Sequence, residues 1–154
     1  MKKNIRRVVA MFLAVAVGGS IATVSASVDK QAIKAAFEKA PGAEMPYIAN
    51  TLVAQARKVD KAETAMEVLR VSVARKPAVC VSVVSFICGL VPDAAADIAA
   101  EAVKLTPQYT RDIARAAAKA APAKIDKITI AILIARKQAA NIGERRLQLR
   151  GLSL

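Results

Sequence analysis

Apolar or small residues recur three and four positions apart through the middle of the chain. The recurring positions are Cys80, Val83, Val84 and Ile87 in residues 77–91, and Ile125, Ile128, Thr129 and Ile132 in residues 122–136. Residues spaced i, i+3, i+4 and i+7 lie on one face of an α-helix, so the pattern is typical of an amphipathic helix with a single apolar stripe. The sequence therefore predicts one short helix in each segment.

A repeat of 15 residues organises these segments. Prolines stand at Pro77, Pro92, Pro107 and Pro122, and aligning the segments that they begin places Val83, Ile98, Ile113 and Ile128 in one column. The first N–H of a helix has no partner inside the helix, so proline is well tolerated there. Each proline is therefore predicted to begin a helix, and Thr106 is expected to cap the helix that begins at Pro107.

The same stripe continues towards the N-terminus without the regular prolines. It is formed by Ala65, Val68 and Leu69, then by Ala49, Leu52, Val53 and Ala56 after Pro46, and then by Ile33, Ala36, Phe37 and Ala40. A helix of roughly 12 residues is marginal alone in water, so about seven such helices must bury their stripes against one another. The predicted fold class is all-α, with short Ala-rich helices stacked as helical hairpins in a short α-solenoid or an irregular bundle.

Composition agrees with helix formation. The chain is 55% hydrophobic, but 34 of its residues are alanine, which forms helices rather than anchoring a chain in lipid. Residues 79–91 are rich in β-branched side chains and so have a strand as their alternative structure. Their place in the repeat favours a helix, which is expected to be the central and most buried one.

The N-terminal residues have the organisation of a secretory signal peptide. Lys2, Lys3, Arg6 and Arg7 precede an apolar run at 8–17, and small residues follow up to a cleavage point after Ala26. Residues 1–26 are therefore predicted to be a signal peptide, which places the mature protein in the periplasm or outside the cell. The alternative is an uncleaved anchor in the inner membrane, because residues 8–28 carry no charge.

After about Asn141 the repeat is lost. The helical-repeat domain is accordingly predicted to span residues 27–141, and residues 142–154, with Gly143 and Gly151, to form a basic flexible tail.

Positive charge is concentrated in the C-terminal third. Residues 27–101 hold 9 basic and 9 acidic side chains, whereas residues 102–154 hold 11 basic and 3 acidic ones. The candidates for binding an anionic surface are Arg111, Arg115, Lys119, Arg136, Lys137, Arg145, Arg146 and Arg150. The first three follow at i, i+4 and i+8, on the helix face opposite Ile113. A solvated helix face followed by a solubilising tail is the alternative interpretation.

The expected partners are a protein or an anionic envelope component, either lipid head groups or polysaccharide. Nucleic acid is disfavoured by the predicted export and by the scarcity of aromatic residues, which are 3% of the chain.

Few residues of the chain suit catalysis. There is no His to serve as a base or a metal ligand, and the only thiols are Cys80 and Cys88. Eight residues along one helix separate the Cα atoms of the two cysteines by about 12 Å, so both are predicted to be buried and unbridged, whereas a disulfide would require a broken helix. Asp97 and Glu101 are expected to lie on a solvated face. No catalytic residue, metal, cofactor or small-molecule substrate is predicted.

Two functions follow from these observations. The favoured one is a non-enzymatic, exported helical-repeat protein that serves as an interaction scaffold for a protein or an envelope component. The alternative is a cationic protein that associates with a membrane surface through its C-terminal helix and tail, because residues 128–135 are apolar on nearly every side.

Overall fold

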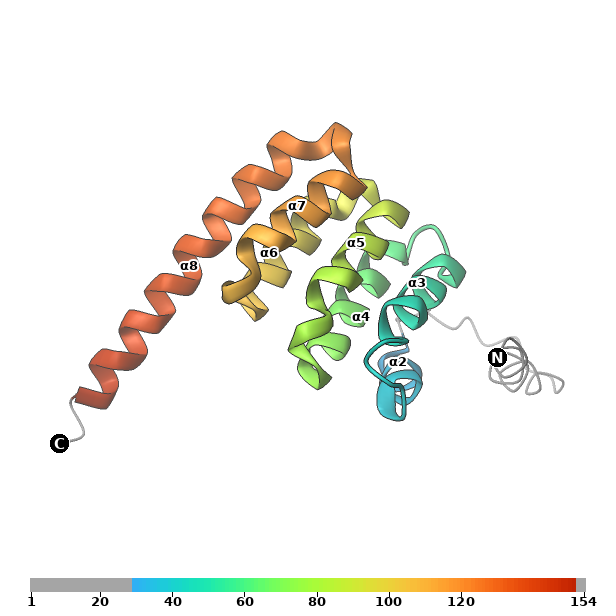
Figure 1. Cartoon of the computed structure of the whole chain (residues 1–154), viewed down its shortest axis with the longest axis horizontal. Coiled ribbons are helices and arrows are strands. Elements are labelled where there is room, and N and C mark those ends of the chain that lie inside the picture. The colour runs from blue at the N-terminus through green and yellow to red at the C-terminus, as the bar shows by residue number, and fades with distance from the viewer. Residues whose placement is uncertain (1–28, 152–154) are drawn as a thin grey trace, which may run out of the picture.

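The protein is a stack of short helices, as the computed structural model shows (Figure 1). The structure describes residues 29–151, with side chains as far as Asn141, and this part contains no strand. The seven α-helices in this part are α2 (Lys30–Glu38), α3 (Met45–Gln55), α4 (Lys61–Arg75), α5 (Cys80–Leu90), α6 (Ala95–Leu105), α7 (Thr110–Ala120) and α8 (Ile125–Gly151). The predicted signal peptide, residues 1–26, lies outside the described residues.

Each repeat proline begins a single turn of 3₁₀-helix that passes directly into an α-helix. These turns are Pro77–Val79, Pro92–Ala94, Pro107–Tyr109 and Pro122–Lys124. The residue before each proline leaves the helical conformation, with ψ between 65° and 92°, because the proline ring disfavours that conformation there. That residue still donates its N–H to the carbonyl four positions back, as Val91 does to Ile87 at 3.0 Å. Consecutive helices are therefore joined at tight corners with almost no loop.

The helices form two layers. One layer contains α3, α5 and α7 side by side, and the other contains α2, α4, α6 and α8, so that neighbours in a layer are two helices apart in the chain (Figure 1). Each corner carries the chain from one layer to the other. The prediction of stacked helical hairpins is confirmed.

The core lies between the layers and contains the predicted stripe. Val83, Ile98 and Ile113 have no exposed surface, and Ile128 is almost fully buried. Small residues such as Ala99, Ala102 and Ala117 are also fully buried, which allows the helix backbones to approach one another closely. Each alanine contributes little apolar area, so the larger side chains supply most of the hydrophobic stabilisation.

Thr106 does not cap a helix. Its side chain makes no capping hydrogen bond and is almost fully buried, with its hydroxyl donating to the Ala102 carbonyl oxygen at 2.9 Å and lying 3.1 Å from the Cys80 sulfur. The capping prediction was wrong because the Thr106 side chain is buried and its hydroxyl bonds back to the preceding helix α6. A buried hydroxyl needs a partner, and the preceding turn supplies one.

The segment with strand-like composition is helix α5. It buries Cys80, Val83, Val84, Ile87 and Cys88, but α6 also buries five residues and α4 buries seven, so the prediction that α5 is the most buried helix was wrong. The reason is the two-layer arrangement, in which every helix buries one face and exposes the other.

Helix α8 is the longest element, with 27 residues, and it extends past its neighbour α6 along one edge of the molecule (Figure 1). The predicted flexible tail began at residue 142, whereas the helix continues without a break to Gly151. Helix α8 therefore extends beyond the last residue of the repeat pattern. Within the described residues no helix combines the length and the hydrophobicity needed to cross a membrane.

Candidate functional site

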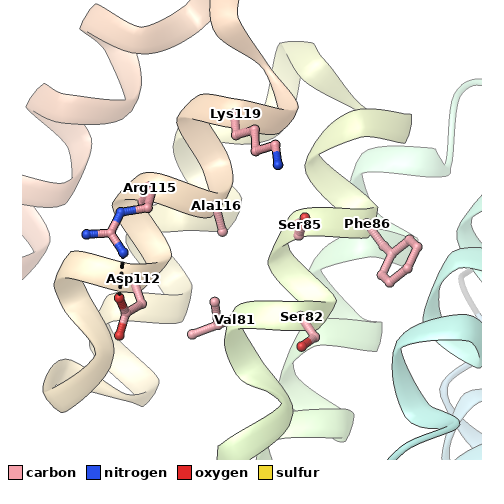
Figure 2. A pocket seen from close by; sticks show the side chains of 8 residues that line it. All are labelled: Val81, Ser82, Ser85, Phe86, Asp112, Arg115, Ala116 and Lys119. Atoms are coloured by element: carbon pink, nitrogen blue, oxygen red, sulfur yellow. Dashed lines mark hydrogen bonds and ion pairs between the residues drawn. The ribbon is translucent and has the colours of Figure 1, made fainter.

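A groove runs along the outer face between α5 and α7. It has a volume of about 410 Å³ and is lined by Val81, Ser82, Ser85, Phe86, Asp112, Arg115, Ala116 and Lys119 (Figure 2). The repeat explains its position, because residues outside the apolar stripe of each helix must face away from the core. Two equivalent helices of one layer therefore place their outward residues on either side of a shared depression.

The charges in the groove differ in their partners. Arg115 Nη1 lies 3.4 Å from Asp112 Oδ1 on the same helix, and both side chains are mostly exposed. Lys119 points from α7 towards α5, on the side of Ser85 (Figure 2). No carboxylate of a described residue lies within 4.0 Å of Lys119 Nζ. Lys119 is thus the cation in this groove that is available to an anionic partner.

An exposed aromatic pair adjoins the groove on the side of α3. The rings of Tyr47 and Phe86 have centroids 5.5 Å apart and are tilted by 48°. Tyr47 is 65% exposed and Phe86 38% exposed. The outer face of α3, α5 and α7 therefore presents aromatic rings, then the hydroxyls of Ser82 and Ser85, and then a cation.

A second groove, of about 560 Å³, lies between α2 and α4 and is lined by Lys34, Glu38, Glu67, Arg70, Val71, Ala74 and Arg75. Its arginines already have partners. Arg70 Nε donates to Glu101 Oε1 at 2.8 Å, a hydrogen bond that raises the pKa of Arg70, and Arg75 donates to the Glu38 carbonyl oxygen. Lys34 has no carboxylate within 4.0 Å among the described residues, but the groove also holds the carboxylates of Glu38 and Glu67, which oppose the binding of an anionic ligand.

The ion pair between Arg70 and Glu101 corrects one prediction about the acidic residues. Asp97 is exposed, as expected of a solvated face, but Glu101 is half-buried and joins α6 to α4 through Arg70. Glu101 therefore contributes to packing within the layer.

The eight basic residues predicted to bind an anionic surface lie on two helices in different layers. Arg111, Arg115 and Lys119 are exposed on α7, and Arg115 and Lys119 line the groove. Arg136 and Lys137 are exposed on α8, and Arg145, Arg146 and Arg150 belong to the same helix beyond the described side chains. The two groups are distributed over both layers rather than along a single stripe.

Cys80 and Cys88 are free and buried, as predicted. Burial raises the pKa of both thiols, that of Cys88 to about 12, and the nearby Thr106 hydroxyl partly opposes this effect at Cys80. Both thiols are therefore neutral packing groups at physiological pH. Within the described part of the chain, no three His, Cys, Asp or Glu side chains are grouped so that they would hold a metal ion.

Sequence reasoning did not identify Tyr47, Ser82, Ser85 and Phe86 as surface neighbours. Tyr47 and Phe86 are separated by most of α3, all of α4 and half of α5, and no local pattern links them. The available signal was the repeat itself, which predicts that the helices pack against one another but not which pairs lie side by side.

Comparisons of the chain with protein-family models, with curated proteins and with solved structures found no match.

Proposed function

We propose that this protein is a non-enzymatic, exported helical-repeat scaffold that binds an acidic partner on the outer face of α3, α5 and α7. The observation that supports the proposal is the groove between α5 and α7, where Lys119 has no carboxylate partner among the described residues and adjoins the exposed Tyr47–Phe86 pair. The partner is a protein segment or an envelope component with anionic groups.

The chemistry of this face suits contact with a macromolecule. Exposed aromatic side chains bury a large area at a small cost in conformational entropy and are frequent anchors of interfaces. An amine at the edge of the contact supplies electrostatic attraction, which raises association rates and selects for negative charge. A stack of repeats adds an extended surface on which neighbouring helices act together.

Site-specific crosslinking tests this proposal. A photo-crosslinking amino acid at Ser85, in the groove, is expected to capture a partner in the cell envelope. The same amino acid at Gln108, an exposed position outside the groove, is the matched control and should capture far less.

Two variants of the Ser85 probe determine whether the capture is specific. Lys119→Glu reverses the charge of the available cation and Tyr47→Ala removes the aromatic anchor, and each should reduce the yield at least about tenfold. Neutralising Arg145, Arg146 and Arg150 together should leave the capture intact. Capture that survives both groove variants, or that is lost with the α8 triple variant, would place the binding site elsewhere.

A further inference from the structure

The outer side of α8 exposes three large aliphatic side chains. Ile130 and Leu133 are each 59% exposed and Ile134 is 54% exposed. The opposite side of the helix carries Ile128, Ile132 and Ala135, which are buried in the core. Between 128 and 135 the helix is therefore apolar on both sides, and only one side is covered by described residues. A helix that is apolar all round is normally buried all round.

The repeat shows that this exposure is a property of α8 in particular. Ile130 and Ile134 occupy the ninth and thirteenth repeat positions, which the other repeat helices fill with small or charged residues: Ser85 and Gly89, Ala100 and Lys104, Arg115 and Lys119. Leu133 occupies the twelfth position, where Cys88 and Val103 are fully buried. No described helix follows α8 to cover it.

Basic residues stand at both ends of the three aliphatic side chains. Lys127 precedes them and Arg136 and Lys137 follow, all exposed, with Asp126 the acidic neighbour. No described carboxylate lies within 4.0 Å of these three cations. A second copy of the chain docked on the same patch would bring these like charges together, which is unfavourable at close range. Charge complementarity therefore favours an anionic partner.

We propose that α8 docks on an anionic phospholipid surface, lying in the plane of the head groups. Ile130, Leu133 and Ile134 enter the boundary of the acyl chains, and Lys127, Arg136 and Lys137 contact lipid phosphates. The 27 residues of α8 correspond to a rod of about 40 Å. This rod forms one edge of the molecule, with no described element on its outer side, so it can approach a flat surface (Figure 1).

The chain contains no Trp, which permits a site-specific fluorescence test. The variant Leu133→Trp, in the exported form of the protein, is mixed with vesicles of phosphatidylglycerol or of phosphatidylcholine. A blue shift of the emission and quenching by brominated acyl chains are expected with phosphatidylglycerol only. Val59→Trp, at an exposed position between α3 and α4 that belongs to neither proposed site, should show neither change.

Vesicle flotation provides the second measurement. Replacing Ile130, Leu133 and Ile134 together by Gln should weaken binding to phosphatidylglycerol vesicles roughly tenfold or more, with the helical circular dichroism unchanged. Neutralising Lys127, Arg136 and Lys137 should also weaken binding and reduce its dependence on salt. Lys119→Glu, in the groove of the proposed scaffold function, should leave flotation unchanged, so that the two proposals fail separately.

Three results would overturn the lipid proposal. They are equal binding to both lipids, flotation that is insensitive to the triple Gln variant, and a dimer in light scattering that the same variant converts to monomers. The last result would assign the patch to a second copy of the chain.

Discussion

Ile113 and Arg115 are two residues apart on α7 and face opposite directions. Ile113 has no exposed surface and lies in the core, whereas the Arg115 side chain is 73% exposed at the groove. Two residues correspond to about 200° of helix rotation, so this separation follows directly from helix geometry.

Replacing Ile113 by Asp should unfold the protein. An unpaired carboxylate in a packed core costs several kcal/mol, which is comparable to the whole stability of a small domain. Arg115→Asp should change the stability by less than about 1 kcal/mol, because the position is exposed. Far-UV circular dichroism during thermal unfolding measures both. Equal destabilisation by the two substitutions would contradict the assignment of faces.

The two thiols should resist alkylation in the folded protein. Burial raises the pKa of Cys88 to about 12, so the reactive thiolate is scarce at pH 8 and the sulfur is also inaccessible. Iodoacetamide followed by mass spectrometry should show no modification under native conditions and two modifications in denaturant. Rapid native alkylation of either thiol would contradict the burial of α5.

The raised pKa of Cys88 also predicts an alkaline loss of stability. The thiol ionises at a higher pH in the folded state than at its ordinary value of 9.0 in the unfolded chain. Its contribution is therefore complete below about pH 9 and is lost as the pH rises towards 12. Urea unfolding of Cys88→Ala should lose less stability over this range than unfolding of the native protein.

Lys124 should hold the carboxyl group of Asp93 ionised in acid. Lys124 Nζ lies 2.8 Å from Asp93 Oδ1, and this hydrogen bond and charge lower the pKa of Asp93. The contribution of the pair is present above the ordinary pKa of Asp93 and is lost as the pH falls through its value in the folded state. NMR titration of Lys124→Gln should show the pKa of Asp93 rising towards its ordinary range.

Lys127→Gln is the matched control for this titration. Lys127 affects Asp93 through its charge alone and more weakly, so its removal should shift the pKa less than removal of Lys124. An equal shift in both variants would mean that the general positive field, rather than the close pair, controls Asp93.

The exported form of the protein should begin near Ser27. The basic residues and the apolar run before that position predict a cleaved signal peptide, and mass spectrometry of the protein from the periplasm or the medium would show the new N-terminus. An intact Met1 in the membrane fraction would support the uncleaved anchor instead.

The helices and their buried faces were determined by the sequence alone. The column of repeat residues is buried because an apolar stripe along a helix is stable only when it packs against the stripes of other helices. Its members are Val83, Ile98, Ile113 and Ile128. The sequence also determines where the helices break, because a proline ring restricts the backbone of the residue before it. The breaks fall at Pro77, Pro92, Pro107 and Pro122. The separation of Cys80 and Cys88 on one helix could likewise be predicted from the helical rise.

Only the tertiary structure decided which outward faces became neighbours. Tyr47 meets Phe86, Lys119 faces Ser85, and Arg70 reaches Glu101 because helices two apart in the chain lie side by side, a relationship that no local pattern encodes. The buried position of Thr106 and the exposure of Leu133 have the same origin. Whether a side chain is covered depends on the helix that packs over it, and for Leu133, at the end of the stack, no described helix does so.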